Sequence, residues 1–263
     1  MSINLVEESI TLMIFTTPRL LAAMSVMPFL SRNFFGGALI RNGIVLSLSI
    51  FLFPVVDAGY QPFELSPLLY GLIIAKEAAI GFCLGWLASL PFWALEGVGF
   101  FIDNQRGSTM ASALNPLTGS QASPIGILLV QSFMTIFFLG GNFLMLLKAI
   151  YTSYAMWPVF SFFPHFHVAG IDFFMAQLSY LMYLIVVFSA PIIVAMFLSE
   201  LGLGLVSRFA PQLNVFFLAM PIKSIIATAM LTFYVAILMS EFSTRYLNVA
   251  NLFTSVFELW DKY

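Results

Sequence analysis

The chain has 263 residues, of which 61% are hydrophobic and only 8% are charged, and its mean hydropathy is +1.00. Soluble domains are about 45–50% apolar and about 25% charged, so this composition predicts an integral membrane protein and excludes an ordinary soluble domain. The formal net charge of −2 excludes a generally basic surface, and nucleic acid is therefore not an expected partner. The length suits one domain of packed helices over residues 1–263.

Six apolar runs follow one another along the chain, at residues 10–30, 38–56, 67–95, 124–147, 173–199 and 215–240. A helix needs about 20 residues to cross a hydrocarbon core of about 30 Å. Five runs reach that length, and the run at residues 38–56 is marginal. No stretch alternates apolar and polar residues as the strands of a membrane barrel do. The sequence therefore predicts an all-α, polytopic membrane-type protein built from about six hydrophobic segments.

Prolines and charged residues interrupt three of these runs, at Pro18-Arg19, at Lys76-Glu77 and at Pro221-Ile222-Lys223. Proline removes a helical hydrogen bond, and a charge inside an apolar run needs a partner, so we expect bent or broken helices buried against protein. Adjacent residues on a helix diverge by about 100° and do not face each other well. Lys76 and Glu77 are therefore each expected to find a partner elsewhere.

Glycines mark two further features of the runs. Gly81 and Gly85 form a small-xxx-small face, which lets two helices approach closely. Gly140-Gly141 interrupts the fourth run and predicts a turn or hinge.

The cluster Asp103-Asn104-Gln105-Arg106, followed by Gly107, separates two long apolar runs. Placing an Asp or an Arg in hydrocarbon costs about 2.5–3.5 kcal/mol each. Two interpretations follow. The cluster is a short solvated loop between membrane helices, or it is a buried polar site that faces a partner subunit or a water-filled path, which we favour.

A second polar stretch begins at Glu200 and contains Arg208, Gln212 and Asn214 among apolar residues. It is either an amphipathic connector at the membrane surface or a connector packed inside an assembly. Glu200 and Arg208 lie eight residues apart, so they share a face only if the intervening glycines do not break the helix. Lys223 follows in the next run, where it either reaches the membrane surface or joins this second polar node.

Catalytic and metal-binding motifs are absent from the sequence. It contains no GxxxxGK[ST] phosphate loop, no GxSxG elbow and no HExxH helix. His165 and His167 have a spacing compatible with a metal, but without suitable neighbouring ligands they are better interpreted as loop residues. Cys83 is a small packing residue. We therefore expect no enzyme activity, no cofactor and no metal.

Three motifs in combination resemble a known family: Asp103-Asn104-Gln105-Arg106-Gly107 after Pro91-Phe92-Trp93, Ser207-Arg208-Phe209-Ala210-Pro211-Gln212-Leu213-Asn214, and Lys223-Ser224. They resemble the SctT family, also called SpaR or YscT, of type III secretion systems, whose flagellar counterpart is FliR. The likeness extends over nearly the whole chain, from the Pro18-Arg19 segment to Tyr234. The Asp-Asn-Gln-Arg sequence favours the virulence injectisome over the flagellum.

The resemblance implies an export gate subunit in the bacterial inner membrane, in contact with membrane lipids. Such a subunit assembles with SctR- and SctS-type subunits into a helical pore complex, with SctU- and SctV-type proteins as neighbours, and unfolded secreted proteins pass through the centre. Its family members fold as bent helical hairpins. Two alternatives remain: a flagellar FliR-type gate subunit, or a small-molecule secondary transporter, although the internal repeat typical of transporters is not evident.

Within that complex, two polar nodes are expected to act in subunit contact or gating: Asp103, Asn104, Gln105 and Arg106 in the first, and Glu200, Arg208, Gln212, Asn214 and Lys223 in the second. The first node leads to a specific expectation. The substitution Arg106→Ala should leave a buried Asp103 unpaired, cost about 3–5 kcal/mol and stop assembly or secretion.

Overall fold

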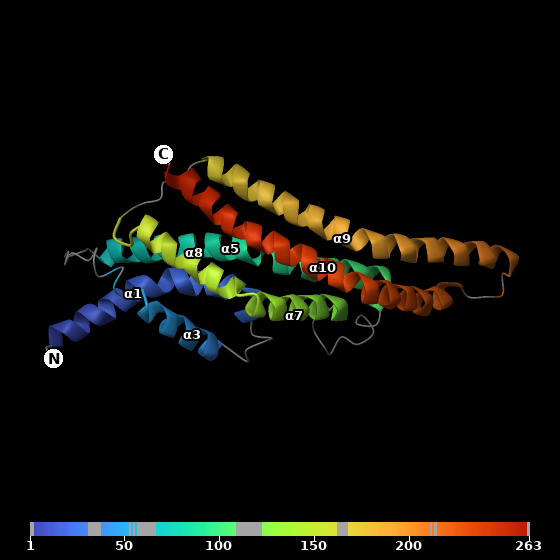
Figure 1. The fold of residues 1–263 in the computed structure, drawn as a ribbon, viewed down its shortest axis with the longest axis horizontal. Helices are drawn as coiled ribbons and strands as arrows, with labels where there is room; N and C mark the ends of the chain where they lie inside the picture. The colour runs from blue at the N-terminus through green and yellow to red at the C-terminus, as the bar shows by residue number, and fades with distance from the viewer. Residues whose placement is uncertain are drawn as a thin grey trace. The chain divides into compact units, whose positions relative to one another are not determined.

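The computed structural model describes residues 3–30, 38–52, 54, 56, 67–108, 123–161, 168–210, 212 and 215–261. These residues form helices and no strands, which confirms the predicted all-α class (Figure 1). In chain order, the helices are α1 (Ile3–Val26), the short 3-10 helix η1 (Pro28–Leu30), α3 (Ala38–Ile50), α5 (Pro67–Gln105), α7 (Pro124–Leu139), α8 (Asn142–Met156), α9 (Val168–Phe209) and α10 (Val215–Asp261).

The helices differ from the apolar runs in their ends. Within the described residues, three helices are long and apolar enough to cross a membrane, or four if α7 and α8 count as one span. The six predicted hydrophobic segments are all helical, but the first and second appear among the described residues as shorter apolar helices, Thr11–Val26 and Ala38–Ile50, so fewer than the five expected reach spanning length there. The first run ends as a helix at Val26, and the fourth is divided between α7 and α8. Gly140 ends α7, and Gly141 precedes α8 with φ of 72°, so the predicted turn at Gly140-Gly141 is confirmed.

Of the bent or broken helices expected at these prolines and charges, none is broken. Helices α1, α5 and α10 run without interruption through Pro18-Arg19, Lys76-Glu77 and Pro221-Ile222-Lys223. A proline removes one hydrogen bond, which a packed helix tolerates when its other turns are satisfied. The charges do not end the helices either, because the side chains find partners, as described below.

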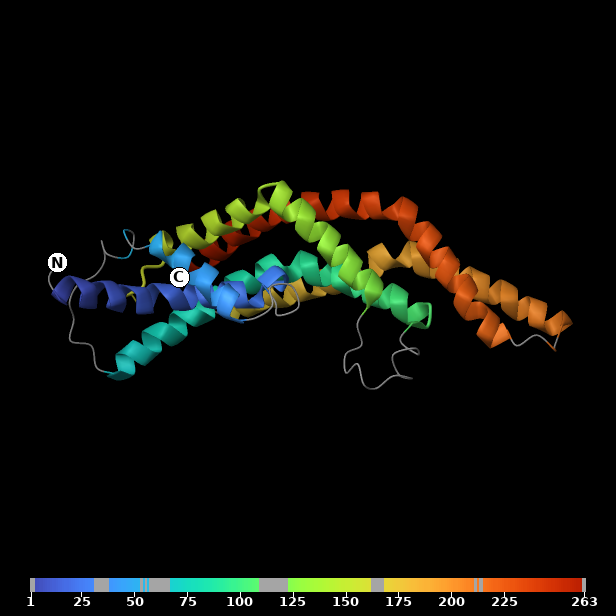
Figure 2. The same cartoon turned by 90° about the horizontal axis from the view of Figure 1, so that it is seen from below.

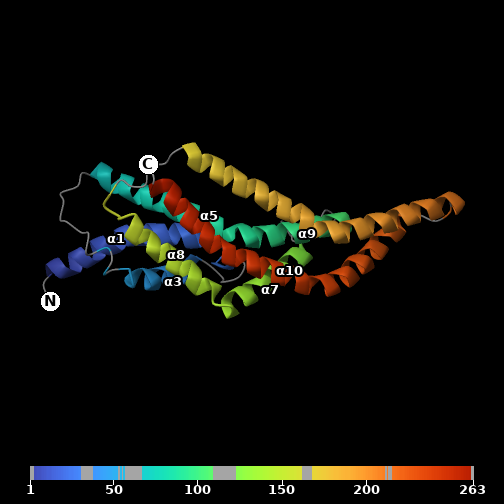
Figure 3. The ribbon, with the colours of Figure 1, turned by 45° about the horizontal axis from the view of Figure 1, so that its top comes forward.

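The chain forms two compact units, and the first comprises Met1–Leu90, Gly141–Ala176 and Tyr246–Tyr263. In this unit α1 packs beside α3, α5 and α8 (Figure 3). A Cβ atom added at Gly81 would lie 2.0 Å from the backbone oxygen of Arg19, and one added at Gly85 would lie 2.4 Å from that of Ala23. The backbones of α1 and α5 thus touch at the predicted glycine face.

The second unit comprises Pro91–Gly140 and Gln177–Arg245. Its core contains aromatic rings that pack mostly edge to face. Phe92 of α5 packs against Phe133 and Phe137 of α7, with ring centroids 4.9 and 5.3 Å apart. Phe242 of α10 contacts Phe133 of α7 and Phe188 of α9. Such pairs contribute about 0.5–1.5 kcal/mol each beyond the area that they bury. Next to the connection between them, α9 and α10 lie side by side (Figure 2).

Candidate functional site

A fully buried ion pair joins α1 to α5 in the first unit. Arg19 donates from Nε to Glu77 Oε2 at 2.7 Å and from Nη2 to Glu77 Oε1 at 2.9 Å, and neither side chain has exposed surface. This bidentate arrangement, with two parallel N–H···O hydrogen bonds, is the strongest form of arginine–carboxylate contact. A buried charge is tolerated only when it is paired and its other donors are satisfied.

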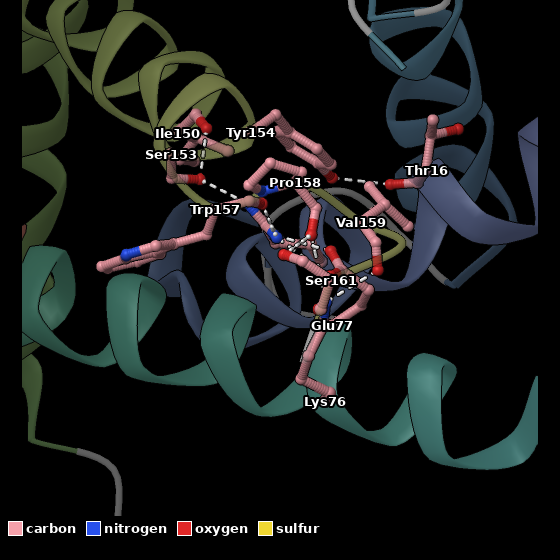
Figure 4. A network of polar contacts seen from close by, with 11 residues as sticks. Thr16, Lys76, Glu77, Ile150, Ser153, Tyr154, Trp157, Pro158, Val159 and Ser161 are labelled. Carbon is pink, nitrogen blue, oxygen red and sulfur yellow. Dashed lines mark hydrogen bonds and ion pairs between the residues drawn. The ribbon is translucent and has the colours of Figure 1, made fainter. Parts of the chain in front are cut away.

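Helix α8 satisfies the rest of the Arg19 guanidinium. Nη1 donates to Ser153 Oγ at 3.1 Å and Nη2 donates to the backbone oxygen of Trp157 at 2.9 Å. The guanidinium carbon also lies 4.2 Å from the centre of the Tyr154 ring, whose hydroxyl donates to the backbone oxygen of Thr16 (Figure 4). One arginine therefore ties three helices together at the centre of the unit.

Lys76 extends this network to the turn after α8. Its Nζ lies 2.9 Å from Glu77 Oε1 and donates to backbone oxygens at Pro158, Val159 and Ser161 (Figure 4). Lys76 and Glu77 each have partners on other elements, as expected. The expectation that they do not also pair was wrong, because the long lysine side chain reaches around to its neighbour.

The sequence located the charged members of this network, Arg19, Lys76 and Glu77, but not the contacts between them. Arg19 and Glu77 are 58 residues apart, and Arg19 and Ser153 are 134 apart. Opposite charges inside two apolar runs were the available signal, because each needs a partner in a chain with few charges. Ser153 and the Trp157 carbonyl gave no such signal, because hydroxyls and backbone oxygens occur everywhere along the chain.

The first predicted polar node lies at the end of α5, within the second unit. Asp103 is 1% exposed. Its Oδ2 accepts hydrogen bonds from Ser123 Oγ at 2.6 Å and from the backbone N–H of Ile125 at 2.9 Å, and its Oδ1 lies 2.7 Å from Arg106 Nε. A carboxylate at the first turn of a helix is favoured by the unpaired N–H groups and the helix dipole there. Asp103 thus binds the N-terminus of α7.

The sequence explains this junction locally. Ser123 is the N-cap of α7 and its Oγ accepts from the backbone N–H of Gly126 at 2.9 Å, while Pro124 occupies the first helical turn. Serine at the cap and proline just inside the helix are both preferred. Gly99 meets Gly126 at the same junction, where an added Cβ would lie 2.2 Å from the Gly126 nitrogen. Asp103 therefore binds at a close contact between α5 and α7.

The other members of the first node are less buried. Asn104 is exposed, Gln105 is half-buried, and the Arg106 side chain is 18% exposed. Asp103, Asn104 and Gln105 belong to the last turn of α5, so this part of the cluster is helix rather than loop. The burial of Asp103 favours the interpretation as a buried polar site, with Ser123, Ile125 and Arg106 of the same chain as the partners that the structure shows.

The second predicted node comes together in part. Helix α9 continues through its glycines to Phe209, so Glu200 and Arg208 lie on one continuous helix. Glu200 pairs with Lys223 of α10, with 3.1 Å between Oε2 and Nζ, and it is 47% exposed. Arg208 and Gln212 are exposed. Asn214 lies outside the described residues, as do His165 and His167.

The chemistry of these groups is structural. Every strongly buried charge described above is neutralised by an opposite charge of the same chain. Among the described residues, no three His, Cys, Asp or Glu side chains are grouped so as to hold a metal ion. The geometry therefore supports a role in positioning helices.

Known proteins resemble this chain over most of its length. The family described as bacterial export proteins, family 1, matches residues 10–249. Yop proteins translocation protein T of Yersinia pestis is 47% identical over 247 residues, which is 94% of each chain. Secretion system apparatus protein SsaT of Salmonella typhimurium is 34% identical over 79% of this chain and 80% of its own. Flagellar biosynthetic protein FliR of Bacillus subtilis is 34% identical over 73% of both.

Proposed function

Because this chain belongs to the family of bacterial export proteins, family 1, we propose that it is an export-apparatus subunit of a type III secretion system of the injectisome class. The observation that carries the proposal is the 47% identity to Yop proteins translocation protein T over 94% of both chains. The flagellar relative is 34% identical over 73% of both chains, so a flagellar export role is the second candidate. The relatives' names describe translocation and secretion apparatus, and the chain is not an enzyme.

The proposed partners are SctR- and SctS-type subunits that build a pore with this chain, and SctU- and SctV-type proteins as neighbours, in the bacterial inner membrane. Unfolded secreted proteins would pass through that pore. The surface of the described helices supports such an assembly. In the most apolar 18-residue window of each long helix, the share of the window that is buried within the chain is 67% in α5, 33% in α9 and 22% in α10. Exposed apolar side chains on α9 and α10 require lipid or partner subunits to cover them.

The two polar nodes are proposed to serve subunit contact. Asp103 fixes the end of α5 against α7, which places Asn104 on an exposed helical turn. The pair of Glu200 and Lys223 is only partly covered, and Arg208 is exposed eight residues further along α9. Charged side chains that a membrane-type chain leaves uncovered are suited to pairing with charges of another subunit.

Purification and secretion together test this function. The tagged full-length chain, extracted from its own bacterium in mild detergent, should co-purify with several other small membrane proteins. Deletion of its gene should abolish secretion of effector proteins and leave flagellar motility unchanged. Loss of motility with normal effector secretion would support the flagellar role instead. A protein that purifies alone as a monomer or homodimer and transports a small molecule would refute both.

A further inference from the structure

The turn after α8 directs three backbone carbonyl oxygens at a single point, which Lys76 Nζ occupies. The Nζ–oxygen distances are 2.7 Å to Val159, 2.7 Å to Ser161 and 3.3 Å to Pro158. Glu77 Oε1 is the fourth oxygen, at 2.9 Å (Figure 4). The three carbonyl contacts are hydrogen bonds, one for each N–H of the ammonium, and the carboxylate contact is an ion pair, so four oxygens surround the nitrogen as a shell.

The size of this shell fits a large monovalent cation. Oxygen ligands lie at 2.3–2.6 Å from Ca²⁺ and at 2.0–2.1 Å from Mg²⁺, both shorter than the 2.7–3.3 Å found around Nζ. Rings of backbone carbonyls are the groups that replace the hydration shell of K⁺ in protein sites. Ammonium and K⁺ are therefore the cations whose size matches these oxygens.

The charge of the shell leads to the same choice. Arg19 already neutralises Glu77 through two hydrogen bonds, so the carboxylate brings no unbalanced charge to the site. The three carbonyls are dipoles that follow the C-terminal end of α8, where cations are favoured. One positive charge is thus stabilised there, while a divalent ion would lack the additional carboxylates that it needs.

We propose that these four oxygens form a monovalent-cation site in which the ammonium of Lys76 is the tethered occupant. The Lys76 side chain is 10% exposed, so the site is largely closed to water. In the natural chain, the turn is held to α5 whatever the surrounding salt. A chain that lacks only this ammonium has a vacancy into which free K⁺ or ammonium binds.

The substitution Lys76→Met tests this directly, because methionine keeps most of the side-chain stem and lacks the terminal charged group. The full-length variant, in detergent, is melted in KCl, in NH₄Cl and in N-methylglucamine chloride at equal ionic strength. KCl or NH₄Cl should raise its melting temperature by about 3 °C or more over N-methylglucamine, with saturation as the salt concentration rises. The natural chain should show no such difference, and Lys76→Arg, which keeps the charge, should not either.

Lys148→Met is the matched control, since it makes the same replacement at an exposed lysine of α8. Its melting temperature should not depend on which of the three cations is present. An equal response of Lys148→Met and Lys76→Met would mean a general salt effect and would overturn the proposal. A Lys76→Met variant that responds to none of the cations, or that folds in none of them, would overturn it as well.

Discussion

Replacing Glu77 by glutamine should destabilise the chain more than any other change to a single charge. The substitution preserves shape and removes the carboxylate that Arg19 contacts with two hydrogen bonds. It leaves the Arg19 cation fully buried, and it leaves Lys76 with carbonyl oxygens alone. Two cations would then share a site from which water is excluded.

The magnitude follows from the burial of the pair. Breaking a buried ion pair by removing one partner costs about 3–5 kcal/mol. The total stability of a folded domain is about 5–15 kcal/mol, so Glu77→Gln should remove a large part of it. Arg19→Met should cost less, because Glu77 keeps Lys76 at 2.9 Å. The most specific expectation is therefore the order: Glu77→Gln should lose more stability than Arg19→Met.

Denaturant unfolding of the purified chain, followed by tryptophan fluorescence, measures both losses. Glu241→Gln is the matched control, because its pair with Arg245 is 3.4 Å long and both side chains are a third or more exposed. That control should lose about 0–1 kcal/mol. Combining Glu77→Met with Arg19→Met should cost less than the sum of the single losses, because the buried Arg19 cation is then no longer left without its carboxylate, and Lys76 keeps its backbone carbonyl partners. Equal losses for Glu77→Gln and Glu241→Gln would refute the reasoning.

Three further outcomes are expected. Gly81→Ala places a Cβ 2.0 Å from a backbone oxygen, so it should cost at least about 1–3 kcal/mol of stability and lower the amount of the protein in the membrane. Gly71→Ala is the control: an added Cβ there meets nothing within 4 Å, so this change should be neutral or slightly stabilising. Asp103→Ala should cost about 1–3 kcal/mol in the same unfolding assay because two buried donors lose their acceptor, and Arg106→Ala should cost less because those donors still satisfy the carboxylate. Lys223→Met breaks a partly exposed pair, so normal stability with reduced effector secretion would identify a subunit contact.

The sequence was sufficient to place the helices, because apolar runs and glycine pairs act locally. Gly140-Gly141 divides two helices as expected, and Gly81 with Gly85 forms the expected contact face. The prolines were misleading, because a local rule for helix ends does not include the packing that holds a helix together on both sides of a proline. Helix α1 continues through Pro18, with the buried residues Phe15 and Arg19 on either side of it.

The pairing of buried charges could not be predicted in the same way. The chain has ten Lys and Arg and twelve Asp and Glu, so many pairings satisfy the requirement that each buried charge has a partner. Choosing among them requires the arrangement of α1, α5 and α8 in space. The partners of Asp103 could not be predicted for a similar reason. They are the Ser123 hydroxyl and the Ile125 backbone N–H, which are 20 and 22 residues away in the sequence and carry no charge. The expected cost of Arg106→Ala is lower now that these partners are known.

This distribution of charge changes what companion subunits have to provide. The sequence suggested that partners shelter the charges of this chain, yet Arg19, Glu77 and Asp103 are neutralised and covered by its own helices. The uncovered surface differs, because it is mostly apolar: exposed hydrophobic side chains occur on several helices, most of all along α9 and α10, where a few charges lie near the connection between the two. Burial of such faces is non-directional and favours any apolar neighbour, whether lipid or protein. Selection of the correct partner must then depend on the exposed charges, and these are the residues at which substitutions should alter assembly while leaving the fold intact.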